Sequence, residues 1–138
     1  MRYLIDTNVL VNLVENGFIS DDIRYILSDY SNQIYICSEC IKEFMLLVEK
    51  NKVQIPREKQ QKINNLFEFV ENELAIQVKY IAKEHLKTFA KINPADGHND
   101  PSDRLIIAQA ITEKIPIISS DKKFSEYRKQ GLEFIPNY

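Results

Sequence analysis

RYLID, residues 2–6, is a short run of mainly apolar residues that ends in an aspartate, and two similar runs follow it, IYIC at 34–37 and IPII at 115–118. Apolar and polar residues do not alternate in these runs, which is typical of strands in a parallel sheet covered on both faces. LAIQV at 74–78 and EFIP at 133–136 are weaker candidates for strands. Together these runs predict a mainly parallel central sheet.

The segments between the runs have the spacing of amphipathic helices. Ser20 is expected to cap a helix over 21–30, and Ser38 is expected to cap the next one. Further helices are predicted over 57–73, over 79–92 and from Asp100 onward, with a last amphipathic piece after Asp121. Strands that alternate with helices indicate an α/β sandwich.

The predicted helix over 79–92 has an apolar side and a basic side. The residues expected to be buried are Val78, Ile81, Ala82, Leu86, Phe89 and Ala90. A lysine recurs every four residues on the opposite side, at Lys79, Lys83, Lys87 and Lys91. Such a stripe could follow a phosphate backbone, but a solvated helix face is the favoured interpretation.

The composition of the 138 residues is that of an ordinary globular protein, with 44% hydrophobic and 28% charged residues. This length predicts a single domain over 1–138. The net charge of −2 argues against a broad basic surface for nucleic acid. The N-terminal segment is a poor signal peptide because Asp6 and Asn8 interrupt it, and the apolar run at 44–48 is far too short to span a bilayer. We therefore expect a cytoplasmic protein that does not use a membrane.

The two cysteines form the motif CSEC, residues 37–40. A redox pair is one interpretation, because the motif lies at a predicted strand-to-helix junction and helix N-termini lower the pKa of a thiol. A zinc site would require further ligands, and His85 and His98 do not have a suitable spacing. We expect Cys37 and Cys40 to be structural.

The stretch DPSDRLIIAQA, residues 100–110, has two aspartates at the start of an apolar helix. Asp100 before Pro101 is typical of an N-cap followed by proline at the first helical position. Asp103 lies in the first turn, where a negative charge suits the helix dipole. Local physical chemistry accounts for both residues without any function.

Four acidic residues from distant segments are nevertheless expected at one edge of the sheet. Ligands collect beyond the carboxyl ends of parallel strands, and the topology brings to that edge Asp6, Glu43, Asp103 and Asp121. Each of them alone has a structural explanation. Two carboxylates about 4 Å apart repel each other by roughly 4 kcal/mol at an effective dielectric constant of about 20. A rim of four therefore predicts a cation between them, and oxygen ligands favour Mg²⁺ or Mn²⁺.

The chain resembles the PIN-domain nucleases in four blocks that follow the family order. The blocks are YLIDTNVL (3–10), SECIKE (38–43), HNDPSDRLIIAQA (98–110) and IPIISSDKKF (115–124). The similarity is closest to the VapC-type ribonuclease toxins of toxin–antitoxin pairs. It implies a PIN-like three-layer α/β/α sandwich over the whole chain. It also implies a Mg²⁺- or Mn²⁺-dependent endoribonuclease that leaves a 5′-phosphate, with an antitoxin partner and a homodimeric state.

The same resemblance assigns roles to individual residues. The acidic site and metal ligands would be Asp6, Glu43, Asp103 and Asp121, supported by Asn8 and Ser119. His98, Asp100 and Arg104 match a motif whose role looks structural. Ser102 departs from the family, in which close relatives usually have an aromatic residue there, and this should alter packing rather than chemistry.

Two other classes of function remain as alternatives. Phosphoaspartate enzymes and receiver domains also place an aspartate at the end of the first strand. A phosphatase of that type would need a second acid two residues later, where Asn8 stands, and a receiver would need paired acids on the first strand. A non-catalytic binding module would retain the fold and use the acids only as helix caps.

Overall fold

The computed structural model describes residues 1–138 and contains one five-stranded sheet in which all neighbouring strands are parallel. The strands are β1 (Arg2–Ile5), β2 (Gln33–Cys37), β3 (Ile76–Lys79), β4 (Ile117–Ser119) and β5 (Phe134–Pro136). Their order across the sheet is β3-β2-β1-β4-β5. All five predicted strands are confirmed, with small shifts of their ends.

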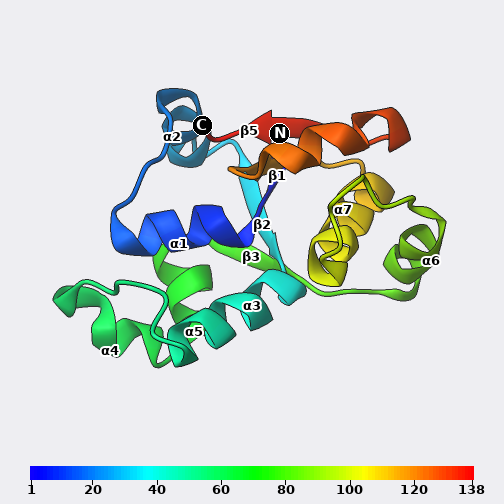
Figure 1. The fold of residues 1–138 in the computed structure, drawn as a ribbon. Helices are drawn as coiled ribbons and strands as arrows, with labels where there is room; N and C mark the ends of the chain where they lie inside the picture. Colours follow the sequence, from blue (N-terminus) through cyan, green and yellow to red (C-terminus); the bar gives the residue numbers. More distant parts are fainter.

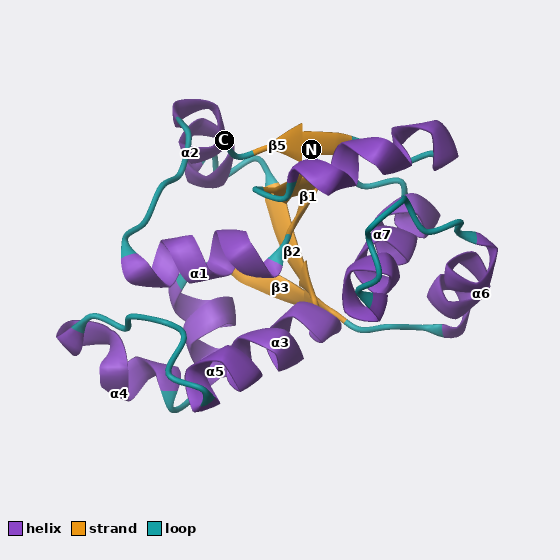
Figure 2. Ribbon diagram, viewed as in Figure 1, coloured by secondary structure: helices purple, strands orange, loops and turns teal.

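Helices cover both faces of this sheet (Figures 1 and 2). The α-helices are α1 (Thr7–Glu15), α2 (Asp21–Ser28), α3 (Ser38–Glu49), α4 (Gln60–Ile63), α5 (Leu66–Glu68), α6 (Lys83–Lys91) and α7 (Pro101–Glu113). Two 3₁₀ helices, η1 (Arg57–Lys59) and η3 (Lys122–Gln130), and one π-helix, η2 (Phe69–Glu73), complete the set. Figure 1 shows α1 and α2 on one side of the sheet and α6 and α7 on the other, so the predicted α/β/α sandwich is confirmed. Each helix is too short or too polar to cross a bilayer.

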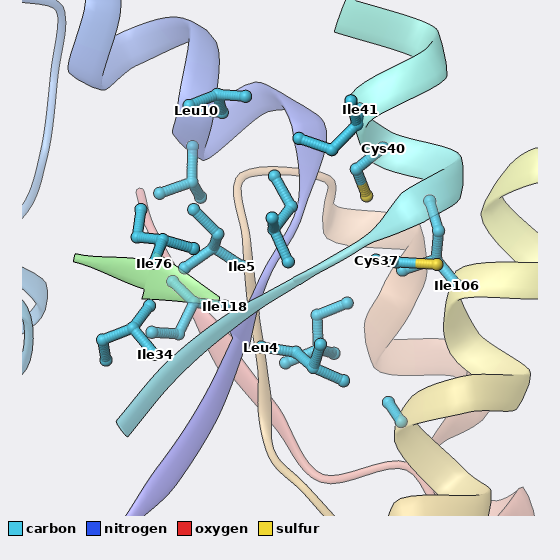
Figure 3. Packing of buried hydrophobic residues seen from close by; sticks show 14 of the residues in the cluster. Leu4, Ile5, Leu10, Ile34, Cys37, Cys40, Ile41, Ile76, Ile106 and Ile118 are labelled. Carbon is cyan, nitrogen blue, oxygen red and sulfur yellow. The ribbon is translucent and has the colours of Figure 1, made fainter. Parts of the chain in front are cut away.

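The core explains why the strand sequences do not alternate. Ile5 pairs in register with Ile36 of β2 and with Ile118 of β4, and all three side chains are fully buried. Figure 3 shows Ile5 and Ile118 on the side of the sheet where Leu10 of α1 lies. Leu4 points to the opposite face and is also fully buried. Because both faces are covered, successive strand residues are apolar.

The prediction of one helix over 57–73 is wrong. The chain forms η1, α4, α5 and η2 there, with a break at Asn64 and Asn65. Asn65 leaves the helical region at φ −118° and ψ 77°, and its Nδ2 donates to Oε2 of Glu68 at 2.8 Å. Asparagine has a low helix propensity because its side chain competes for local hydrogen bonds, and two consecutive asparagines interrupt the helix.

The prediction of a helix over 79–92 is confirmed only in part, because α6 covers Lys83–Lys91. Of the residues expected to be buried, Val78, Ile81 and Phe89 pack against the core, but Ala82, Leu86 and Ala90 are exposed. Residue Lys79 ends β3 and forms an ion pair with Glu113 at 2.9 Å, and α6 begins four residues later. His85 is the buried residue of α6, whereas Leu86 is 53% exposed. Nδ1 of His85 accepts the N–H of Ala82 at 2.9 Å. This bond holds the ring of His85 toward the protein interior. The four lysines do not form one helical stripe, because Lys79 lies on β3 and not on α6.

The first turn of α3 differs from the prediction as well. Cys37, not Ser38, is the N-cap, because its Sγ accepts the N–H of Glu39 at 3.4 Å. The hydroxyl of Ser38 instead accepts the N–H of Ile81 at 3.2 Å and ties α3 to the segment after β3. Ser20 caps α2 as predicted. The structure also adds α1, which the sequence analysis does not predict.

Candidate metal centre

The four predicted acids line one pocket of about 280 Å³. Asp6 follows β1 directly, and Asp121 lies two residues after β4. Glu43 lies in the second turn of α3, and Asp103 is the third residue of α7. Since α3 and α7 pack against each other at this edge, the structure brings the four carboxylates together. Their chemical roles remain predictions.

Asp6 is the deepest of the four carboxylates and is only 3% exposed. It is the N-cap of α1, where Oδ1 accepts the N–H of Thr7 at 2.8 Å. Its Oδ2 accepts hydrogen bonds from Asn8 Nδ2 at 3.0 Å and from Ser119 Oγ at 2.7 Å. Burial, followed by the negative charge of Asp103, raises the pKa of Asp6 to about 6 in spite of these bonds.

Asn8 and Ser119, the two predicted supporting residues, join the β1–α1 junction to the end of β4. Asn8 Oδ1 accepts the N–H of Ser120 at 3.0 Å, and Asn8 Nδ2 donates to Ser119 Oγ at 3.2 Å. Ser119 Oγ also accepts the N–H of Asp121 at 3.0 Å. One serine hydroxyl thereby orients both an acidic side chain and the backbone of the next acid.

Glu43 is the least satisfied of the four carboxylates. Thr7 donates its hydroxyl to Oε2 at 3.3 Å, but Oε1 is buried without any hydrogen-bond partner in the protein. Burial, with the charges of Asp6 and Asp103, raises the pKa of Glu43 to about 7. A buried carboxylate oxygen without a donor is costly, so this atom is suited to an external ligand.

Asp103 has a histidine beside it. Oδ2 lies 3.0 Å from Nε2 of His98, and Nδ1 of that ring lies 2.6 Å from the hydroxyl of Tyr127. Burial raises the pKa of Asp103, and the hydrogen bond from His98 opposes that shift. One ligand atom each from His98, Asp103 and Asp121 lie within 4.8 Å of one another. Sequence reasoning assigned His98 a structural role and did not single out Tyr127, which no local motif marks.

The neighbouring residues of the α7 motif lie outside the pocket. Asp100 caps α7, because its Oδ1 accepts the N–H of Ser102 at 2.9 Å. Ser102, which replaces the family's aromatic residue, donates its hydroxyl to Glu39 Oε1 at 2.9 Å. The guanidinium of Arg104 stacks over the ring of Phe89, with 4.5 Å from Cζ to the ring centroid. These contacts agree with a structural role for the motif.

The two cysteines are free and buried. Burial raises the pKa of Cys37 to about 11 and that of Cys40 well above its ordinary value. The reactive and metal-binding form of cysteine is the thiolate. Both thiols therefore stay protonated at neutral pH, which argues against the redox and zinc interpretations.

The pocket as a whole has the donor set of a hard divalent cation. Its charged lining consists of four carboxylates, with no lysine or arginine among the lining residues. Mutual repulsion contributes to the raised pKa of Asp6 and of Glu43. A cation would offset this repulsion and would also satisfy Oε1 of Glu43. Mg²⁺ and Mn²⁺ prefer such oxygen ligands, so the residues present fit either ion.

The comparisons with known proteins identify the class to which this α/β/α architecture with an acidic pocket at the sheet edge belongs. The family model of the PIN domain matches residues 3–130. The chain belongs to the PIN-domain family. A comparison with curated protein sequences gives no match.

Several solved structures have the same fold. The chain is similar to the VapBC2 structure of Rickettsia felis, with a TM-score of 0.67 and 18% identity over 99% of this chain and 98% of that one. FitAcB of Neisseria gonorrhoeae matches with a TM-score of 0.69 and 17% identity over 98% and 97% of the two chains. VapBC-1 of Haemophilus influenzae matches with a TM-score of 0.64 and 17% identity, over 99% of this chain and 98% of that one. At these identities the likeness shows that the chains share one fold.

Proposed function

We propose that this chain is a Mg²⁺- or Mn²⁺-dependent endoribonuclease and the toxin of a toxin–antitoxin pair. One observation carries the proposal: four carboxylates converge in a pocket whose lining contains no lysine or arginine, and one buried oxygen, Glu43 Oε1, has no partner. Without a cation this pocket would repel a phosphate backbone. With one, the same pocket attracts it.

The burial and the hydrogen bonds of each carboxylate suggest its role in the reaction. A bound divalent cation supplies charge neutralisation, a polarised phosphoryl oxygen and a more acidic water. Asp6 and Asp103 are the first ligands we assign, because hydrogen bonds hold both side chains in place. Glu43 either joins them or accepts a proton from the attacking water through Oε1, and Asp121 completes the rim. Hydrolysis would leave a 5′-phosphate and a 3′-hydroxyl.

We further propose the partners and setting that such a toxin needs. The VapBC and FitAcB neighbours are toxin–antitoxin structures, which supports a cognate antitoxin that masks the pocket of this chain. We also propose a single domain over 1–138 that works as a homodimer in the cytoplasm. Light scattering of the purified chain, with and without the protein encoded beside it, tests both states of assembly.

Cleavage of a labelled single-stranded RNA pool, with and without Mg²⁺, tests the function. Asp6→Asn and Glu43→Gln should each reduce cleavage by orders of magnitude, since an amide is a weaker ligand for a hard cation. Asp22→Asn is the matched control, because it makes the same chemical change at an exposed position in the first turn of α2, outside the pocket.

Three outcomes would count against the proposal. Equal cleavage by Asp6→Asn and the wild type would exclude the acidic pocket as the active site. Binding of Mg²⁺ without cleavage of RNA would favour the non-catalytic module. Cleavage of single-stranded DNA in preference to RNA of the same sequence would change the substrate class.

A further inference from the structure

A buried chain of hydrogen bonds runs from the backbone of one loop to the acidic pocket. Tyr127 of η3 is fully buried, and its hydroxyl accepts the N–H of Ala95 at 3.0 Å. The same hydroxyl lies 2.6 Å from Nδ1 of His98, which is 4% exposed. Nε2 on the far side of the ring lies 3.0 Å from Oδ2 of Asp103. Three segments of the chain thus meet in a line that ends at a predicted metal ligand.

Every hydrogen bond in this series can be satisfied if each group donates toward Asp103. The oxygen of Tyr127 already accepts from Ala95, so its own hydrogen is available for Nδ1 of His98. A neutral imidazole that accepts at Nδ1 carries its hydrogen on Nε2. That hydrogen points at a carboxylate, which is the stronger kind of acceptor. His98 is therefore an oriented donor to Asp103.

The ring has little freedom to turn away from this arrangement. It packs edge-on against the ring of Tyr127 at 5.4 Å between centroids and is tilted against Phe124 at 6.1 Å. The loop that carries the histidine is also tied down, because Lys123 Nζ donates to the carbonyl of Gly97 at 2.8 Å. Gly97 has φ +74°, a conformation that favours glycine.

We propose that His98, oriented by Tyr127, is a positioning residue that holds Asp103 in the rotamer needed to bind the cation. The hydrogen bond occupies Oδ2, and the structure shows no hydrogen bond to Oδ1 of the same carboxylate. One oxygen is thereby anchored and the other stays available to a ligand. Outer partners of this kind typically change metal affinity about 10- to 100-fold. The inference rests on the metal site of the proposed function.

The affinity for Mn²⁺ alone, measured by titration calorimetry, tests the proposal without RNA. His98→Leu removes the donor and should weaken Mn²⁺ binding about 10- to 100-fold. His98→Gln places an amide donor near the position of Nε2 and should recover most of that loss. Tyr127→Phe leaves the histidine without its orienting hydroxyl and should give a smaller loss. His85→Leu is the matched control, because His85 is equally buried, at 4%, but accepts the N–H of Ala82 before α6 and does not line the acidic pocket.

Nitrogen NMR of the imidazoles gives a second measurement that does not depend on the variants at position 98. The chain has two histidines, so His85→Leu assigns both signals. In the wild type at mildly alkaline pH, His98 should carry its hydrogen on Nε2 and should keep it when Mg²⁺ is added. Tyr127→Phe should produce a mixture of the two tautomers.

The possible results separate this inference from the proposed function. Wild-type affinity for Mn²⁺ in a folded His98→Leu protein would overturn the positioning role and leave the nuclease proposal intact. If that variant does not fold, two other results together would overturn the positioning role. These are an affinity of Tyr127→Phe for Mn²⁺ equal to that of the wild type, and a wild-type His98 that carries its hydrogen on Nδ1. Loss of the Nε2 hydrogen on addition of Mg²⁺ would make His98 a direct ligand, which also overturns it. A wild type that binds Mn²⁺ with the dependence on His98 and Tyr127 described above, but does not cleave RNA, would refute only the proposed function.

Discussion

Ser119 donates its hydroxyl hydrogen to Oδ2 of Asp6 across 2.7 Å, although 113 residues separate the two in the sequence. The hydroxyl oxygen of Ser119 also accepts the N–H of Asp121 at 3.0 Å. The contact exists because β1 and β4 are neighbours in the sheet, with Ile5 in register with Ile118. The geometry of the acidic pocket therefore depends on strand pairing as well as on the acids themselves.

Ser119→Ala should lower the free energy of unfolding by about 1–3 kcal/mol, because Asp6 loses a donor and the N–H of Asp121 loses its acceptor. Urea unfolding of the metal-free protein measures the change. Ser125→Ala is the control, since its hydroxyl bonds at the surface to the carbonyl of Lys122, and it should change stability by less than about 0.5 kcal/mol. Equal losses in the two variants would contradict a special role for the buried serine.

The metal-free protein should lose stability as the pH rises. The pKa of Asp6 is raised from 3.8 to about 6 and that of Glu43 from 4.5 to about 7. The folded state therefore keeps protons that the unfolded state releases at lower pH. This stability is complete below the ordinary pKa values and is lost as the pH passes through the raised ones. For Asp6 the loss is of the order of 3 kcal/mol.

Urea midpoints between about pH 4 and pH 8 measure this dependence. Glu43→Gln should flatten the upper part of the profile, since the titrating group is gone. A metal-free wild type whose stability rises over this range would contradict the raised pKa values.

Mg²⁺ or Mn²⁺ should raise the melting temperature, because the cation binds the carboxylate rim only in the folded state. The double variant Asp6→Asn/Asp103→Asn should lose most of this response. Asp21→Asn/Asp22→Asn removes two exposed acids from the first turn of α2 and should respond like the wild type. If the pocket variant responded like this control, the metal would bind elsewhere.

Asp100 and Asp103, three residues apart on α7, should behave in opposite ways when changed. Asp100→Ala should cost about 1 kcal/mol of stability through loss of the N-cap, while cleavage of RNA is largely retained. Asp103→Asn should leave the metal-free protein at least as stable, because it relieves repulsion in the pocket. Its cleavage rate should fall by orders of magnitude. Melting curves and cleavage rates measure both variants, and the reverse pattern would mean that the two roles are exchanged.

The strand pattern, the caps at Ser20 and Asp100, and the order of the elements follow from the sequence because they depend on neighbours along the chain. Apolar runs predict strands buried on both faces, and an aspartate before Pro101 predicts a helix start. Parallel strands then place Asp6 and Asp121 at one edge. The family resemblance supplied what composition could not, namely the assignment of Asn8 and Ser119.

Only the tertiary structure decided which side chains meet across elements. The rotation of α6 buries His85 and exposes Leu86, and it depends on the hydrogen bond to Ala82 and on packing. The spacing of apolar residues therefore predicted the wrong buried face for this helix. The line from Tyr127 through His98 to Asp103 joins residues of η3, a loop and α7. A hydrogen bond between such segments requires a distance of about 3 Å and a fixed direction. Sequence spacing determines neither of these, and they arise only when the layers pack.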